Sequence, residues 1–395
     1  MSSNPVVIVS ARRTPIGGFQ GGLGTVSATD LGAAAIASGI ADASIAGDDV
    51  SEVIMGCVLP AGLGQAPARQ AAIAGGIPVG VGCTTINKVC GSGMKAAMLA
   101  NDLLMAGSAR VVVAGGMESM SNAPYLLPKA RGGYRMGHQQ VLDHMFFDGL
   151  QNPYDGQMMG HFAEATADKY AFSRAEQDAF AEESVRRALA AIETGAFKAE
   201  IAPVTVKSRK SEAIVDKDEE PFNCDIEKIP TLRPAFRREG GTVTAASSSS
   251  ISDGAAALVM MRENEARERG LKPLARVIGH SGFAHEPEWF TTAPVGAIRA
   301  LHAKLGLAPA DVDLYEINEA FAVVTMAAIR DLDLDPARVN VNGGACALGH
   351  PIGATGARLL VTLLHALEAR SMKVGIAGLC IGGGEATAIA LERIA

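Results

Sequence analysis

The chain has 395 residues, enough for two or three domains with sizeable hydrophobic cores. Apolar residues make up 48% of the chain and charged residues 19%, which excludes a disordered protein. The net charge of -7, with no long basic run, argues against a nucleic-acid-binding protein. No apolar run of about 20 residues is present to span a membrane, and no secretory signal precedes the first strand-like segment.

The six cysteines lie apart in the sequence, at positions 57, 83, 90, 224, 346 and 380. No two of them have the C-x-x-C spacing of zinc or redox sites. We therefore expect a cytoplasmic protein with reduced cysteines and no bound metal.

Strands and helices alternate over the first 118 residues. Strands are predicted at residues 5–10, 50–58 and 109–114, and helices at residues 28–45 and 66–74. This alternation favours a parallel or mixed sheet with helices on its faces.

Residues 86–107 contain the first candidate for a reactive side chain. Cys90 is followed by Gly91 and Gly93 and by a helical run from Met94 that is apolar nearly all round. A helix of that pattern is buried, so Cys90 lies at the mouth of a buried helix, where free N–H groups and the helix dipole favour an anion. This setting predicts a lowered thiol pKa and a nucleophilic thiolate. The alternative is a buried structural cysteine, since free cysteines are among the most buried residues.

The pattern changes between residues 119 and 241. Residues 124–160 have no clear periodicity, which predicts a long irregular excursion of the kind that is usually functional. An amphipathic helix is predicted at residues 173–192, because Ser173 and Glu176 form a capping box and Gly195 lies just past its end.

The order of the first part repeats in the last part of the chain. Residues 311–318 resemble residues 49–56, and the helix and strand at residues 356–378 resemble those that follow Gly93. Matching segments in the same order predict two similar α/β domains, with the irregular region inserted between them.

This second copy supplies further candidate side chains. His350 lies in a glycine-rich turn before the second buried helix, where the first copy has Cys90. Asn318 and Cys380 lie at the ends of predicted strands, and each alone has an ordinary structural explanation, which for a strand-end asparagine is a turn or cap. Because open α/β sheets bind ligands at the carboxyl ends of their strands, together they predict a nucleophile, a base, a second thiol and an amide donor around one crevice.

Five motifs carry a resemblance to a known family. They are NKVCGSGMKA around Cys90, GGMESMS from Gly115, INEAFA around Asn318, GGACALGHPIGATGAR around His350 and GLCIGGG around Cys380. In these motifs, and over essentially its whole length, the sequence resembles the thiolases, which are acyl-CoA C-acetyltransferases. The resemblance implies the thiolase fold, a five-layer α-β-α-β-α sandwich of two duplicated α/β domains with an inserted loop domain. The implied domains are residues 1–118 with 250–272, the loop domain 119–249, and residues 273–395.

The resemblance also implies a role for each motif residue. Cys90 would be the nucleophile that forms an acyl-enzyme, and His350 would take its proton. Cys380 would protonate the leaving group and then deprotonate the second acetyl-CoA at its α-carbon. Asn318 would hold a water that stabilises the enolate with His350, and the N–H groups of Cys90 and Gly382 would form the oxyanion hole. A Claisen condensation of thioesters needs such a nucleophile, base and enolate-stabilising donor.

The implied activity is the reversible condensation of two acetyl-CoA molecules to acetoacetyl-CoA and CoA, by a ping-pong mechanism and without a cofactor. Members of the family are dimers or tetramers of tight dimers, and residues 125–145 would contribute to the tetramer contacts. The implied contacts of CoA and the acyl group are Leu150, Met159, Ser249, Ala320 and Phe321.

Two aromatic residues depart from the family pattern. Phe222 stands where many members have an arginine against the adenine of CoA, and Phe290 stands where short-chain members often have a methionine beside the acyl group. We expect the ring of Phe222 to stack on adenine, and Phe290 to cap a short acyl pocket together with Met159. Cys346 replaces a common aliphatic residue, and we assign it no function.

Three other functions are alternatives to the reversible synthesis of acetoacetyl-CoA. The closest is a 3-ketoacyl-CoA thiolase of fatty-acid β-oxidation, which accepts longer chains. A Cys/His metal or redox site is disfavoured by the spacing of these residues. An acyl-CoA-binding scaffold without catalysis is disfavoured because the four candidate catalytic side chains are all present.

Overall fold

Two sheets form the core of the computed structural model, which describes residues 4–207 and 211–394. The strands of the N-terminal sheet are β1 (Val6–Arg13), β3 (Glu52–Gly56), β4 (Gly82–Ile86), β5 (Val111–Ser119) and β10 (Ser252–Arg262), with the short β2 (Gly17–Gly18) beside β10. The strands of the C-terminal sheet are β11 (Ala275–Ala284), β12 (Leu314–Ile317), β13 (Val374–Ile381) and β14 (Glu385–Arg393). They join through β1 and β11, which share only two residue pairs, so the sheets divide there.

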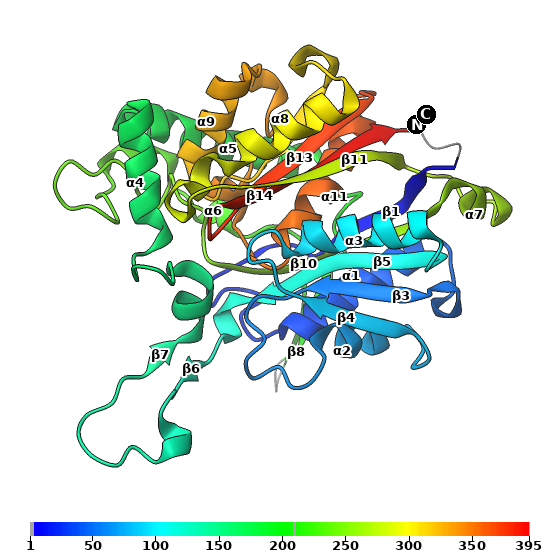
Figure 1. Ribbon diagram of the computed structural model, residues 1–395, viewed down its shortest axis with the longest axis horizontal. Coiled ribbons are helices and arrows are strands. Elements are labelled where there is room, and N and C mark those ends of the chain that lie inside the picture. Colours follow the sequence, from blue (N-terminus) through cyan, green and yellow to red (C-terminus); the bar gives the residue numbers. More distant parts are fainter. Residues whose placement is uncertain (1–3, 208–210, 395) are drawn as a thin grey trace.

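Helices cover both sheets and fill the space between them (Figure 1). They are α1 (Ala28–Asp42), α2 (Pro67–Ala74), α3 (Ser92–Ala106), α8 (Ala293–Leu305), α9 (Ala322–Leu332) and α11 (Thr355–Ala369). Alternate residues of a strand point to opposite faces. In β1, Ile8 contacts the central cluster around α3 and α11, whereas Val7 contacts the cluster under α1 and α2. In β14, Leu391 contacts the central cluster, whereas Ala390 contacts the cluster under α8. Helices therefore pack on both faces of each sheet, and the five-layer sandwich is confirmed.

The predicted duplication is present in the strand order. The N-terminal sheet runs β3-β5-β10-β1 and the C-terminal sheet runs β12-β13-β14-β11, each with a parallel pair followed by antiparallel pairs. The N-terminal sheet has β4 in addition, parallel to β3 at its edge. The domain bounds stay a prediction. The pairing of β10 with β1 and β5 supports the assignment of residues 250–272 to the first domain. Residues 1 and 395, at the outer ends of the predicted domains, lie outside the described residues.

The two central helices approach each other closely at their first turns. A Cβ on Gly93 would lie 2.8 Å from the backbone nitrogen of Ala357, and a Cβ on Gly356 would lie 2.4 Å from that of Met94. Both positions therefore need glycine. Because the N-terminal turns of α3 and α11 are in backbone contact, the preceding turns, with Cys90 and His350, are brought together.

The region between residues 119 and 251 contains more regular structure than its sequence predicted. The excursion at residues 124–160 was expected to be irregular, but it contains a short hairpin that extends from the body (Figure 1) and a π-helix at residues 145–150. The predicted capping box of α5 is confirmed, since Ser173 Oγ accepts from Glu176 N and Glu176 accepts from Ser173 N. No helix of the described ranges is long and apolar enough to cross a membrane. The remaining elements are β6 (Tyr125–Leu126), β7 (Leu142–Asp143), α4 (Met159–Tyr170), α5 (Arg174–Thr194), β8 (Val204–Lys207), β9 (Glu212–Val215), α6 (Glu220–Asn223), α7 (Glu263–Glu268) and α10 (Ala345–Leu348).

Candidate active site

A cavity of about 210 Å³ collects residues from both halves of the chain and from the inserted region. Asn318 and Cys380 are fully buried and are not among the cavity-lining residues, whereas Phe222 lies elsewhere on α6. No group of three or more His, Cys, Asp or Glu side chains in the described chain could hold a metal ion. Predicted site residues that line the cavity are Cys90, Leu150, Met159, Ser249, Phe290, Ala320, Phe321, His350 and Gly382.

The turn that holds Cys90 is tightly closed. Ser92 Oγ accepts from Lys88 N at 2.8 Å and donates to Val89 O at 2.7 Å. Val89 has φ 47°, a left-handed conformation that is strained for a β-branched residue. A Cβ on Gly91 would lie 2.4 Å from Ile381 Cδ1, so a larger residue here would displace the Ile381 side chain at the end of β13.

The predicted acidity of Cys90 is wrong. Desolvation at the cavity wall raises the pKa of Cys90 to about 11, although the N–H groups of Gly382 and of Cys90 itself favour the thiolate. The charge of Glu118 raises this pKa further. Cys90 does precede the first turn of α3, as predicted. The cost of desolvating its thiolate is nevertheless larger than the stabilisation that the N–H groups at this helix end provide. Cys90 is therefore a neutral thiol at neutral pH and needs a base.

His350 was predicted to be that base, and its hydrogen bonds suit the role. Its Nδ1 lies 2.6 Å from Thr355 Oγ1, and the Thr355 hydroxyl in turn lies 2.9 Å from Pro351 O, to which it donates. We therefore assign the proton of the neutral imidazole to Nδ1, which donates to Thr355, and leave Nε2 as the acceptor. Burial, and then the charge of Arg358, lowers the pKa of His350 to about 3, so the ring is neutral at neutral pH.

Asn318 and Cys380 are buried beside residues that line the cavity. Asn318 Nδ2 lies 3.5 Å from His350 Nε2, and Asn318 Oδ1 has no hydrogen-bond partner among the described residues. Burial raises the pKa of Cys380 well above its usual value, and interaction with Cys90 raises it further. The two thiols are therefore electrostatically coupled neighbours, contributed by opposite halves of the chain.

The turn after β13 completes the arrangement. The N–H groups of Gly382 and Cys90 both approach the Cys90 sulfur. An acyl group bonded to that sulfur would place its oxygen near the same two donors, as an oxyanion hole requires. Gly383 and Gly384 follow with φ 95° and 88°, which favour glycine. An ion pair between Lys88 and Glu385 joins this turn to the Cys90 turn.

Comparison with known proteins agrees with this geometry. Residues 6–264 match the family model described as thiolase, N-terminal domain, and residues 271–393 match thiolase, C-terminal domain. The chain belongs to the thiolase family. It is 52% identical to the acetyl-CoA acetyltransferase of Escherichia coli, over 98% of this chain and 99% of that relative. It is 51% identical to acetyl-CoA acetyltransferase 2 of Arabidopsis thaliana, over 100% of this chain and 98% of that relative.

Solved structures give the same result for the fold. The Ascaris suum thiolase crystallised in complex with coenzyme A is similar with a TM-score of 0.94 and 45% identity, over 99% of this chain and 100% of that one. The Bacillus anthracis acetyl-CoA acetyltransferase is similar with a TM-score of 0.97 and 42% identity, over 99% of both chains.

In this thiolase, the predicted acyl contacts form one wall of the cavity. Ser249 N and Oγ both donate to Ala320 O, at 3.0 and 3.1 Å, which ties two wall segments together. Met159 begins α4, and its sulfur lies 3.6 Å from the position of a Cβ on Gly382. Phe290 is 3% exposed and packs edge-on to Phe162, with ring centroids 6.3 Å apart.

Other wall residues were missed from the sequence. Met120, Phe146 and Phe236 line the thiolase cavity as well. Met120 belongs to the GGMESMS motif, which was a usable signal, whereas Phe146 lies in the π-helix, which left no periodic pattern. The ring of Phe222 is 59% exposed and outside the cavity lining, so its contact with adenine stays a prediction.

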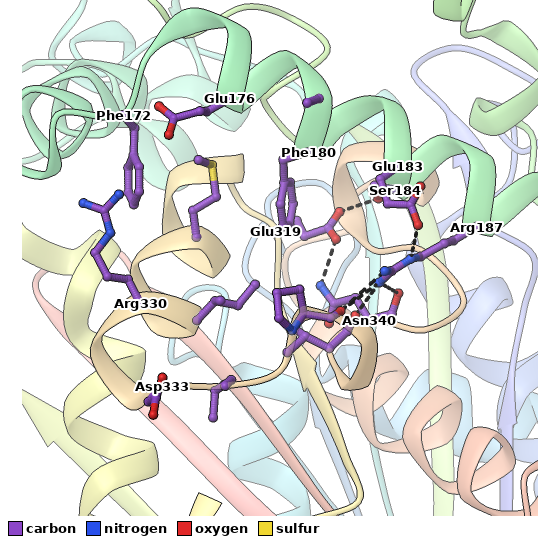
Figure 2. Close-up of a pocket in the computed structure, with 16 residues that line it drawn as sticks. Phe172, Glu176, Phe180, Glu183, Ser184, Arg187, Glu319, Arg330, Asp333 and Asn340 are labelled. Atoms are coloured by element: carbon purple, nitrogen blue, oxygen red, sulfur yellow. Dashed lines mark hydrogen bonds and ion pairs between the residues drawn. The ribbon is translucent and has the colours of Figure 1, made fainter.

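A larger cavity, of about 680 Å³, lies between α5 and α9 (Figure 2). The Glu319 carboxylate at its wall accepts from Ser184 Oγ at 2.7 Å and from Asn340 Nδ2 at 2.8 Å. No predicted catalytic residue is among its described lining residues. The predicted catalytic residues Cys90, His350 and Gly382 line the smaller cavity instead, and Glu319 anchors the segment that carries Asn318.

Proposed function

We propose that this thiolase is an acetyl-CoA C-acetyltransferase that interconverts two acetyl-CoA molecules with acetoacetyl-CoA and CoA. The observation that carries the proposal is the meeting of Cys90, His350 and the Gly382 N–H in one cavity, with Cys380 coupled to Cys90. Relatives of 51% and 52% identity that are named acetyl-CoA acetyltransferase support it.

The first half-reaction moves an acetyl group from CoA to the enzyme. Because Cys90 and His350 are both neutral at rest, the thiol proton moves to His350 Nε2 as the sulfur attacks the thioester carbon. The N–H groups of Cys90 and Gly382 donate to the carbonyl oxygen as it becomes negative. When the C–S bond of the substrate breaks, the CoA thiolate takes the proton of Cys380, which leaves Cys380 as a thiolate beside imidazolium.

The second half-reaction uses the base that the first one produced. The Cys380 thiolate removes a proton from the α-carbon of a second acetyl-CoA, and burial, which raises the pKa of Cys380, makes that thiolate a strong base. The enolate oxygen is stabilised by His350 and by a water on Asn318, whose Oδ1 has no protein partner among the described residues. The α-carbon then attacks the acetyl group, and Cys90 leaves with the proton of His350. The reaction needs no resident cofactor.

Acetoacetyl-CoA is the proposed best substrate. The cavity of about 210 Å³ is small, and the ring of Phe290 and the side chain of Met159 form part of its wall. The alternative is a 3-ketoacyl-CoA thiolase of β-oxidation, which needs a channel for longer chains. A series of steady-state thiolysis measurements, from four-carbon to sixteen-carbon 3-ketoacyl-CoA, separates the two. A kcat/KM that is highest for four carbons supports the proposal, and a preference for eight or more carbons supports the alternative.

We also propose that the enzyme is a homodimer that pairs into a tetramer. β4 is paired on one side only, with β3, so its other edge is available to a second copy.

The hairpin between β6 and β7 supplies exposed apolar side chains for a further contact, between two dimers. Deleting residues 127–141 is expected to leave a dimer by light scattering, and an unchanged mass would contradict this role. The exposed side chains are Tyr125, Leu127, Met136 and Val141.

The proposed compartment is the cytoplasm. All six cysteines are free thiols, which suits a reducing compartment. Fractionation of cells that express the protein, followed by immunoblotting, tests this assignment.

A further inference from the structure

Glu118, in the GGMESMS motif, is a buried carboxylate to which the reaction above gives no role. It lies near the end of β5 and is fully buried. Its two oxygens accept backbone N–H groups from Val58 at 2.9 Å, Leu59 at 3.1 Å and Gly353 at 2.9 Å. One carboxylate therefore joins the segment after β3 to the turn that follows His350, although these segments belong to opposite halves of the chain.

The backbone packs closely around this connection. A Cβ on Gly116 would lie 2.0 Å from Gly353 O, and a Cβ on Gly56 would lie 2.8 Å from it. Gly353 is three residues from His350 and two from Thr355, whose hydroxyl orients the His350 ring. The hydrogen bond from Gly353 to Glu118 therefore fixes the turn of the base against the sheet that ends near the nucleophile.

We propose that Glu118 is a positioning residue of the thiolase reaction, which in its ionised form holds the His350 turn in register with Cys90. This inference rests on the proposed function. An ionised carboxylate only accepts hydrogen bonds, whereas a protonated one carries an O–H on one oxygen. Because both oxygens of Glu118 already accept backbone N–H groups, protonation removes the negative charge that these three contacts share and weakens them. The base turn then loosens, and proton transfer from Cys90 slows.

The groups around Glu118 make this state observable in the pH dependence of activity. Burial raises the pKa of Glu118 to about 7, and no lysine, arginine or histidine of the described residues forms an ion pair with it. The titratable groups that face it are the thiols of Cys57, at 3.7 Å, and Cys90, and burial raises the pKa of both. The pKa of His350 is lowered to about 3, so neither member of the Cys90–His350 pair titrates near neutral pH. Activity is therefore expected to fall as the pH drops through about 7.

The test compares kcat and KM for acetoacetyl-CoA thiolysis in wild type, Glu118→Gln and Cys57→Ala between pH 6 and pH 9. Glu118→Gln directs an NH₂ group at backbone donors, so kcat is expected to fall about ten- to a hundredfold, while KM stays within about twofold. Its kcat should no longer change through pH 7. Cys57→Ala removes the thiol contact, which helps to hold the pKa of Glu118 down, and keeps the three backbone contacts. Its kcat at pH 9 should therefore match wild type, and its fall in kcat should move to a higher pH.

Burial also raises the pKa of Glu316, to about 8, so its titration could change kcat in the same pH range. The pH profile of Glu118→Gln separates the two carboxyls, because Glu316 is unchanged in that variant. A fall in kcat near pH 7 that persists in Glu118→Gln, or a loss confined to KM, would overturn the inference. If thermal unfolding shows that Glu118→Gln is not folded, the wild-type profile still decides, because a flat kcat between pH 6 and pH 8 also overturns it. A wild type with no thiolysis at any pH would overturn the proposed function, and this inference with it.

Discussion

Phe290 is the residue whose replacement should change the substrate range most. Its ring is 3% exposed, lines the same cavity as Cys90, and packs edge-on to Phe162 at an interplanar angle of 80°. A phenyl ring is more rigid than the methionine side chain expected at this position, which fills gaps by rotation. Phe290→Ala is therefore expected to extend the cavity beyond the four-carbon substrate.

The size of the effect follows from the methylene groups that the extended cavity can bury. Each buried CH₂ contributes about 0.8 kcal/mol, which is about a fourfold gain in kcat/KM. In Phe290→Ala, two added carbons should therefore raise kcat/KM about fifteenfold relative to the same substrate pair in wild type. The same change should lower the free energy of unfolding by about 3–5 kcal/mol, the usual loss for a buried phenylalanine.

The assay is thiolysis of four-, six- and eight-carbon 3-ketoacyl-CoA by wild type, Phe290→Ala and Phe162→Ala. Phe162 is the matched control, because it is 6% exposed and packs on Phe290 but does not line the cavity. Phe162→Ala should lose similar stability and keep the wild-type chain-length profile. An unchanged profile in Phe290→Ala would show that the ring does not limit chain length and only packs in the core of the inserted region.

Three further substitutions test separate parts of the site. Cys380→Ser should reduce acetoacetyl-CoA synthesis more than the exchange of label between acetyl-CoA and CoA, because a serine hydroxyl is far less acidic than a thiol; equal losses would contradict the division of roles. Phe222→Ala should raise the KM for CoA with little change in kcat, as expected for lost stacking on adenine, and an unchanged KM would place the ring elsewhere. Val89→Gly should raise the free energy of unfolding by about 1 kcal/mol, because the relief of strain at φ 47° exceeds the entropy that glycine adds to the unfolded chain. A lower free energy of unfolding in a urea titration would show that the strain is negligible.

Local patterns in the sequence were enough to predict the frame of the site. The apolar run after Cys90 and the glycines around it indicated a buried helix and a tight turn, and both are present in α3. The capping box at Ser173 was equally local. The duplicated order of segments also predicted two similar domains. In the structure, residues 49–56 and 311–318 contain equivalent strands, β3 and β12, each of which pairs with a parallel neighbour.

Properties that depend on distant parts of the chain could not be predicted in the same way. The pKa of Cys90 is set by desolvation in a cavity whose walls come from residues 120 to 382, so the dipole of its own helix was a poor guide. The partners of Glu118 are backbone N–H groups of two separate segments, which leave no side-chain pattern in the sequence. Phe146 reaches the cavity from a π-helix, whose period differs from that of an α-helix.

Cys90 is predicted to carry the acetyl group between the two half-reactions. Wild type and Cys90→Ala are incubated with acetyl-CoA, quenched in acid, digested and mapped by mass spectrometry. Wild type is expected to carry one acetyl group on the peptide that contains Cys90, and Cys90→Ala is expected to carry none. An acetyl group on Cys380, or one that persists in Cys90→Ala, would contradict the assignment.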